Sequence, residues 1–215
     1  RSRWDPTATG TRGSQIIGNY LKKCMAWTGN NTIDYVVMSH LHNDHMGDCS
    51  SSLPMSSKGS YRLNGLTEIL DDFNVSRIID RGWPDYDYPF DMQNLASNKA
   101  TIQNYVKAVK WHVANSGLKA EIFKAGSASQ IAPKSSKYDV RIRNIAVNGE
   151  IWTGNGTETK MTFPEKKDIQ VVNPAKVTGT DKCPAENICS AVMRISYGKF
   201  DYFAGADLQY NNRSN

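Results

Sequence analysis

Three of the four histidines in the chain lie within six residues of one another, in the segment Ser39-His40-Leu41-His42-Asn43-Asp44-His45. Imidazole and carboxylate groups are the ligands that zinc, iron and manganese take in proteins. Side chains two residues apart in an extended segment project to the same side, so His40 and His42 are expected to reach one ion together. Asp44 and His45 follow where the chain turns and are expected to face a neighbouring ion. The alternative is a surface loop with chance histidines, but neutral imidazoles packed this densely have little other use.

A second candidate ligand, Asp207, lies near the other end of the chain, after the apolar strand pattern Phe200-Asp201-Tyr202-Phe203 and three small residues, Ala204-Gly205-Ala206. Small residues let the backbone approach a buried centre closely. Asp207 is therefore a candidate for a carboxylate shared between two ions, as in two-metal hydrolases. By composition alone it could equally cap a helix or a turn. Only its partnership with the histidine segment favours the metal-binding interpretation.

The elements expected to position these residues are strands. The run 33–38 (Ile-Asp-Tyr-Val-Val-Met) predicts a buried strand that leads straight into the histidine segment. Before it, apolar residues at helical spacing predict a helix over 14–27, with Ser14 as the N-cap. Residues 188–197 and 200–203 predict two strands joined as a hairpin at Gly198-Lys199.

The middle of the chain alternates predicted helices and strands, so the fold class is α/β or α+β, in one domain spanning residues 1–215. The helices are expected over 63–73 and 92–113, and the strands over 76–79, 121–123, 138–147 and 151–152. Segments 49–62 and 153–186 are expected to be loops. Two prolines forbid a helix through the aromatic segment 81–90, where Trp83, Tyr86 and Tyr88 could line a substrate cleft or form a packed cover.

The segment Asp34 to Gly47 resembles the H-x-H-x-D-H signature of the metallo-β-lactamase superfamily, which follows a hydrophobic strand and precedes a small residue. Residues 187–207, with the run RISYGKFDYFAGAD, are similar to the later strand pair and bridging aspartate of that family. The helix before the motif also fits, most like the competence-protein branch involved in DNA uptake. The resemblance covers roughly residues 10–48 and 187–208.

The resemblance implies an αββα sandwich with ions at the edge where two sheets meet. By position, His40 and His42 would bind the first ion, Asp44 and His45 the second, and Asp207 would bridge them. The family usually supplies one more histidine before the bridging aspartate, but the only histidine in that interval, His112, is predicted on a helix surface. Polar residues often fill this position in the competence-like branch, and Asn187 or Ser190 would do so here.

The resemblance also implies a first β-hairpin before the helix at 14–27 and a final histidine well after the bridging aspartate. We expect both to be missing from this chain, as in a fragment; a degenerate member of the family is the alternative. The chain starts at Arg1, so the sequence leaves any signal segment, and with it the compartment, unspecified.

The composition of the chain is that of a globular protein. Its 215 residues are 39% hydrophobic and 22% charged, which excludes a disordered chain and supports a core that needs no disulfides. No apolar run approaches the ~20 residues of a membrane span. Cys183 and Cys189 could close a small disulfide loop, although scattered cysteines are more often buried thiols. The net charge of +5 mildly favours an anionic partner.

Together these features predict a metal-dependent hydrolase that uses a metal-activated water, with one or two zinc ions; manganese or iron is possible at such ligands. Asp44 is also expected to act catalytically by orienting the nucleophilic water. The substrate is expected to be an anionic small molecule or nucleic acid, with phosphodiesters favoured and Trp83, Tyr86 and Asn187 contacting it. The alternative is a non-catalytic metal-binding or scaffold domain of the same fold. The sequence does not specify the oligomeric state.

Overall fold

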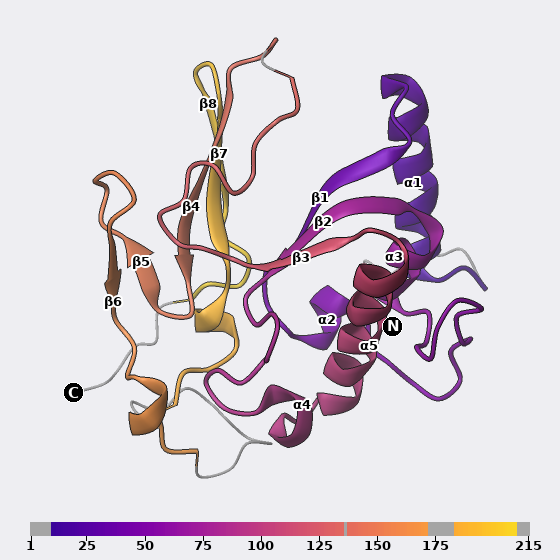
Figure 1. Cartoon of the computed structure of the whole chain (residues 1–215), viewed down its shortest axis with the longest axis horizontal. Helices are drawn as coiled ribbons and strands as arrows, with labels where there is room; N and C mark the ends of the chain where they lie inside the picture. The colour runs from indigo at the N-terminus through magenta and orange to yellow at the C-terminus, as the bar shows by residue number, and fades with distance from the viewer. Residues whose placement is uncertain (1–9, 136, 172–182, 210–215) are drawn as a thin grey trace. The chain divides into compact units, whose positions relative to one another are not determined.

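The computed structural model describes residues 10–135, 137–171 and 183–209 (Figure 1). The chain divides into two compact units. The first unit comprises the described residues of Arg1–Val36, Asn43–Arg77 and Ala100–Lys119. The second comprises those of Val37–His42, Ile78–Lys99 and Ala120–Asn215.

A parallel three-stranded sheet is formed by β1 (Thr32–Met38), β2 (Asn74–Asp80) and β3 (Lys119–Ile122), in the order β1-β2-β3. Helix α3 (Gly65–Asp72) lies between the first two strands in the chain, and α5 (Lys99–Asn115) between the second and third. Parallel strands need such crossovers, and their carboxyl ends meet at one edge of the sheet. The boundary between the two units passes through each of these strands. The predicted strands at 33–38, 76–79 and 121–123 are confirmed apart from their ends.

The first unit contains α1 (Gly13–Thr28) and α2 (Asn43–Met46) besides α3 and most of α5. The predicted helix at 14–27 is confirmed, but its N-cap is Arg12 and not Ser14. Ser14 lies inside the first turn, is buried, and donates its hydroxyl to the Glu68 carboxylate of α3. Glu68 also pairs with the Arg12 guanidinium, so one buried carboxylate ties the start of α1 to α3.

The predicted helix at 92–113 is two helices in the structure. The short α4 (Met92–Leu95) is capped by Asp91, whose carboxylate accepts hydrogen bonds from the backbone N–H groups of Gln93 and Asn94. The chain leaves helical geometry at Ala96, and α5 begins at Lys99. The Asp91 cap marks the start of α4. The break between the two helices comes at Ala96, whose backbone is extended although the apolar spacing continues across both helices.

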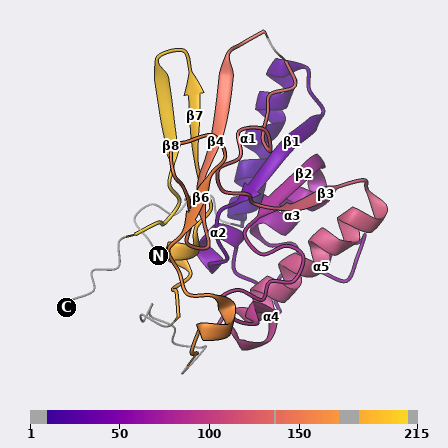
Figure 2. The same cartoon turned by 60° about the vertical axis from the view of Figure 1, so that its left-hand side comes forward.

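An antiparallel sheet of five strands lies in the second unit, in the order β6-β5-β4-β7-β8 (Figure 2). Its strands are β4 (Val140–Val147), β5 (Glu150–Trp152), β6 (Thr159–Met161), β7 (Val192–Tyr197) and β8 (Phe200–Ala204). The expected hairpin at Gly198-Lys199 is confirmed: β7 pairs with β8, with Ser196 opposite Asp201, and Gly198 adopts φ 58° in the turn. The left-handed φ explains why glycine occupies this turn.

Two sequence predictions differ from this sheet. The segment 153–186, expected to be a loop, contains β6 and a short 3-10 helix, η1 (Lys166–Asp168); residues 172–182 lie outside the described residues. The strand expected over 188–197 begins only at Val192, because Asn187–Cys189 forms another 3-10 helix, η3. The coarse class, a mixed α/β fold, is confirmed. Cys183 and Cys189 are both free buried thiols, and not a disulfide.

Candidate metal centre

The segment that carries the first two histidines is held in place by its backbone. The N–H of Leu41 donates to Oε1 of Glu186 at 2.6 Å, and the carbonyl oxygen of Leu41 accepts from Nδ2 of Asn98 at 2.6 Å. The carbonyl oxygen of Ser39 accepts from the N–H of Ala191 at 2.8 Å. Leu41 is also fully buried. Three hydrogen bonds and one buried side chain therefore fix the backbone from which His40 and His42 project.

The ring of His40 is fully buried and has polar neighbours at both nitrogens. Its Nδ1 lies 3.3 Å from the Ser39 hydroxyl, and its Nε2 lies 3.2 Å from Nδ1 of His42. The two rings meet edge to face, with centroids 4.9 Å apart. The imidazoles of His40 and His42 therefore lie side by side, while their joint binding of one ion stays a prediction. A partner at Nδ1 is the usual way in which a metal-binding histidine keeps its other nitrogen oriented.

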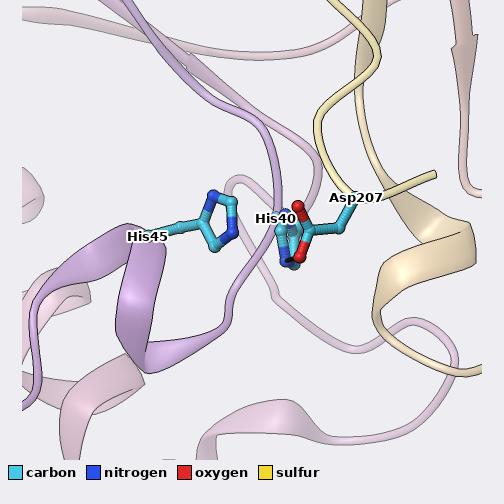
Figure 3. Close-up of side chains that lie close together, drawn as sticks. All are labelled: His40, His45 and Asp207. Atoms are coloured by element: carbon cyan, nitrogen blue, oxygen red, sulfur yellow. Dashed lines mark ion pairs between the residues drawn. The ribbon is translucent and has the colours of Figure 1, made fainter. Parts of the chain in front are cut away.

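Asp207 approaches the same ring from the far end of the chain. Its Oδ2 lies 3.9 Å from Nε2 of His40, and its side chain is 41% exposed (Figure 3). It follows β8 in a turn closed by the N–H of Leu208 on the carbonyl oxygen of Gly205, at 3.1 Å. The pairing of β7 with β8 thus brings a residue distant in sequence to the histidine segment, within the second unit.

The remaining residues of the motif are in α2. Nε2 of His45 lies 3.8 Å from Oδ2 of Asp44, whose side chain is 77% exposed. His40, His45 and Asp207 each offer a ligand atom, and this group could hold a metal ion (Figure 3). His42 and Asp44 are not members of this group, although each lies beside one of its histidines.

A buried ion pair, Arg81–Glu186, stabilises the histidine segment through the hydrogen bond that Glu186 accepts from Leu41. The guanidinium of Arg81, whose side chain is fully buried, donates from Nε to Oε1 of Glu186 at 2.7 Å and from Nη2 to Oε2. Its Nη1 donates to the carbonyl oxygen of Tyr88 and to Oδ1 of Asn148. Burial acts to raise the pKa of the Glu186 carboxyl, but the charge and hydrogen bonds of Arg81 outweigh it, so the pKa is lowered. Glu186 is therefore a carboxylate when it accepts from Leu41.

Sequence reasoning missed Arg81, Glu186 and Asn98. Arg81 carried a signal, because it follows directly on β2 as the histidine segment follows on β1. Glu186 lies in the segment expected to be a loop, and Asn98 lies inside the helix expected over 92–113. Nothing in the sequence separates either residue from other surface residues.

Asn187 and Ser190, predicted to stand where related proteins have a histidine, lie at η3, beside Glu186. Oδ1 of Asn187 is buried and has no hydrogen-bond partner among the described residues. The hydroxyl of Ser190 is engaged, because it donates to the carbonyl oxygen of Asn187 at 2.7 Å. Of the two, Asn187 is thus the one with an unused oxygen, and a buried oxygen without a donor is a group that a cation would satisfy.

The aromatic loop requires one correction. Tyr86, predicted to contact substrate, is fully buried, and its hydroxyl donates to Oδ2 of Asp80 at 2.8 Å. It packs in the core and does not line a cleft. Trp83 is half-buried, with its ring edge against Tyr86 at a centroid distance of 6.4 Å. The interpretation of this loop as a packed cover is the one that the geometry supports for Tyr86.

His112 also differs from its prediction. It was expected on the surface of a helix, but it is buried in α5. Its Nε2 lies 2.9 Å from the hydroxyl of Tyr61 and its Nδ1 lies 2.9 Å from the hydroxyl of Ser116. Both ring nitrogens have partners, so His112 is a satisfied core histidine of the first unit.

The residues that the structure gathers fit a transition-metal ion by their chemistry: two imidazoles and a carboxylate are preferred ligands, and the buried Asn187 oxygen lies on the segment that contacts the histidine backbone. No protein-family model matches the chain, and no curated protein matches it. Among residues 10–135, 137–171 and 183–209, none of the helices has the length and apolar character needed to span a membrane.

Proposed function

We propose that this chain is a metal-dependent hydrolase of the metallo-β-lactamase type, whose two sheets are those of the family's αββα sandwich. The observation that carries the proposal is the 3.9 Å approach of Asp207 to Nε2 of His40. These two residues are 167 positions apart in the sequence, and the motif resemblance pairs them as ligands of one centre. A chance histidine cluster gives no reason for a carboxylate to arrive there.

The residues of the centre would have two roles, metal binding and positioning of the attacking water. His40, His45 and Asp207 would hold a zinc ion, with manganese or iron as alternatives, and His42 would join them or bind a second ion beside Asp44. A bound ion would supply an activated water at neutral pH. Asp44 is exposed beside His45, so its carboxylate is free of a burial cost and is suited to orient that water or accept its proton.

The substrate class that we propose is the phosphodiester. The chain has 26 Lys and Arg against 21 Asp and Glu, so an anionic substrate is favoured over a cationic one. A carboxylate shared between two ions suits a phosphoryl centre, because both the attacking and the leaving oxygens are stabilised. The same ligands also support lactam hydrolysis, so an assay has to distinguish phosphodiester substrates from lactams.

The test is a parallel assay on bis-p-nitrophenyl phosphate, single-stranded DNA, a chromogenic cephalosporin and an acyl thioester, each with zinc and with manganese. We expect hydrolysis of the two phosphodiesters, lost in Asp207→Ala and retained in the control Asp168→Ala, which removes an exposed carboxylate of η1. Activity confined to the cephalosporin or the thioester would overturn the phosphodiester proposal but keep the hydrolase. Hydrolysis that is equal in Asp207→Ala would overturn the centre itself.

A non-catalytic metal-binding domain is the second candidate. The observation that favours it is the ligand group itself, in which three residues converge while Asp44 and His42 stay outside. Such a set can hold one ion for structure. If the chain binds metal but hydrolyses none of the four substrates, this second function is supported and the hydrolase is excluded.

A further inference from the structure

Four side chains form a row across the antiparallel sheet of the second unit, which we call the arginine–aromatic row: Trp152, Arg143, Arg194 and Phe203. Arg143 of β4 is directly opposite Arg194 of β7, and Arg194 is directly opposite Phe203 of β8. Cζ of Arg143 lies 4.6 Å from the ring centroid of Trp152. Directly opposed residues share a face of a sheet, so two cations stand in the middle of the row with an aromatic ring at each end.

Folding alone gives no reason for this arrangement. Like charges directly opposite each other on antiparallel strands are destabilising. Among the described residues, the hydrogen-bond acceptors of Arg143 are neutral: its Nη1 donates to the carbonyl oxygens of Gly126 and Gly156, each at 2.7 Å. Nε of Arg194 lies 3.8 Å from Oδ1 of Asp201, and both side chains are at least half exposed. Such an exposed pair offsets little of the repulsion.

The row borders a hollow of about 380 Å³. Three arginines line it, Arg141, Arg143 and Arg194, and the described lining residues include one carboxylate, Asp201. Ser196 contributes a hydroxyl, and the loop at 128–133 provides an apolar wall. Nε of Arg141 lies 3.4 Å from Oδ1 of Asp139, and both side chains are exposed. The hollow therefore carries a surplus of guanidinium groups, which bind phosphate oxygens through paired N–H donors.

The aromatic residues decide which anion this surface fits. Phe203 is 59% exposed on the face that carries Arg194. The other exposed rings of the hairpin, Tyr197, Phe200 and Tyr202, alternate with these residues and lie on the opposite face of the sheet. An exposed ring beside an arginine is the combination that proteins use for single strands, since every base can stack on a ring while the backbone follows the positive charge. A small inorganic anion would use the arginines and leave Phe203 without a role.

We propose that the arginine–aromatic row and its hollow bind single-stranded nucleic acid, with phosphates at Arg141, Arg143 and Arg194 and bases stacked on Phe203 and Trp152. This inference goes beyond the proposed function. The surface shares no residue with the candidate metal centre, and it needs no metal ion to bind its ligand.

The experiment measures binding of a fluorescent oligothymidine to the full chain in the presence of a chelator, at several salt concentrations. We expect Phe203→Ala to weaken binding at least about fivefold with an unchanged salt dependence. Arg194→Ala should also weaken binding and reduce the slope of log affinity against log salt by about 0.7, the contribution of one phosphate contact on a single strand. Both residues are exposed, so both variants are expected to keep the wild-type thermal midpoint.

The matched control removes an exposed cation and an exposed ring from another element, Lys23→Ala and Trp27→Ala of α1, and should leave binding unchanged. No binding of the oligonucleotide by the wild-type chain would overturn the proposal. So would an equal loss in the α1 control, or displacement by millimolar phosphate with no effect of Phe203→Ala, which would indicate a simple anion site. Because the chelator removes metal, these outcomes do not depend on whether the hydrolase proposal holds.

Discussion

The carboxylate of Glu186 accepts the backbone N–H of Leu41 at 2.6 Å, and Leu41 stands between the two histidines of the candidate metal centre. The same carboxylate is paired with the fully buried Arg81, whose own pKa is raised: burial opposes the charge, but Glu186 more than compensates. One buried ion pair therefore supports the stretch of backbone from which His40 and His42 project. This relationship makes the ion pair and the candidate metal centre depend on each other.

The ion pair predicts a stability pattern. Glu186→Gln keeps an oxygen for the Leu41 N–H but leaves Arg81 charged and unpaired, so we expect a loss of about 3–5 kcal/mol in the free energy of unfolding. The double variant Arg81→Met/Glu186→Gln should recover much of that loss, because the buried guanidinium is removed together with its carboxylate partner. Urea unfolding measures both. Strictly additive effects of the two substitutions would contradict the coupling.

The matched control for this prediction is Glu68→Gln in the first unit. Its partner Arg12 has a side chain 33% exposed, so the guanidinium can be hydrated when the carboxylate is lost. We expect a clearly smaller loss than for Glu186→Gln. A loss of equal size would mean that burial of the arginine does not set the cost.

His112 predicts a pH dependence of stability. Burial lowers its pKa below the ordinary value of 6.5, and the charge of Lys58 adds to this effect, while Asp71 opposes it. The unfolded chain therefore binds a proton at a pH where the folded chain does not, and stability falls as the pH drops below about 6.5. One such group contributes at most about 1.4 kcal/mol per pH unit within that window.

The measurement is the free energy of unfolding between pH 5 and pH 8 for the wild type and His112→Gln. The variant should have a flatter profile below pH 6.5, and any difference at pH 8 reports only the lost contacts with Tyr61 and Ser116. Parallel profiles for the two proteins would contradict the prediction.

The cysteine thiols give a third prediction. Burial raises the pKa of Cys189 to about 12, and burial also raises the pKa of Cys183, so neither forms a reactive thiolate at neutral pH. A thiol reagent at pH 8 should modify both only after unfolding, and a reductant should not change the thermal midpoint. A Cys183–Cys189 cross-link in peptides from the unreduced native protein would show that this is wrong.

A variant of Tyr86 can distinguish the two interpretations of the aromatic loop, a packed cover or the lining of a substrate cleft. Tyr86→Phe removes the hydrogen bond to the Asp80 carboxylate, which the N–H groups of Gly82 and Trp83 also contact. We expect a loss of about 1.5–3 kcal/mol in stability, typical of a buried bond to a charged group. The KM for a phosphodiester substrate should not change. A higher KM with unchanged stability would return Tyr86 to the substrate site.

Much of the positioning scaffold was predictable, because its signals are local. The strand before His40 and the hairpin before Asp207 are both present as predicted, although the strand is half-buried and only Met38 in it is buried. The apolar pattern from 92 to 113 predicted one continuous helix and gave no sign of the break at Ala96. The N-cap of α1 was wrong because Glu68, 54 residues away, draws Ser14 into the helix.

The sequence could not predict which side chains are buried by segments that are distant in the chain. His112 and Tyr86 look like surface and cleft residues until Tyr61 and Asp80 are seen to satisfy their polar atoms. The opposition of Arg143 and Arg194 likewise depends on the register of β4 with β7, which the pattern of either strand leaves undetermined. Which residues lie close to His40 also depends on the tertiary structure. The motif therefore indicates the candidate ligands but not which of them come together.

The most direct test is the zinc content of the chain after zinc loading and exhaustive dialysis, compared among the wild type, Asp207→Asn and the control Asp201→Asn. We expect at least one tightly bound zinc ion per wild-type chain, a clear loss of zinc in Asp207→Asn, and the wild-type zinc content in Asp201→Asn. A wild-type chain that retains no zinc, manganese or iron, or an Asp207→Asn chain that retains as much as the wild type, would contradict it.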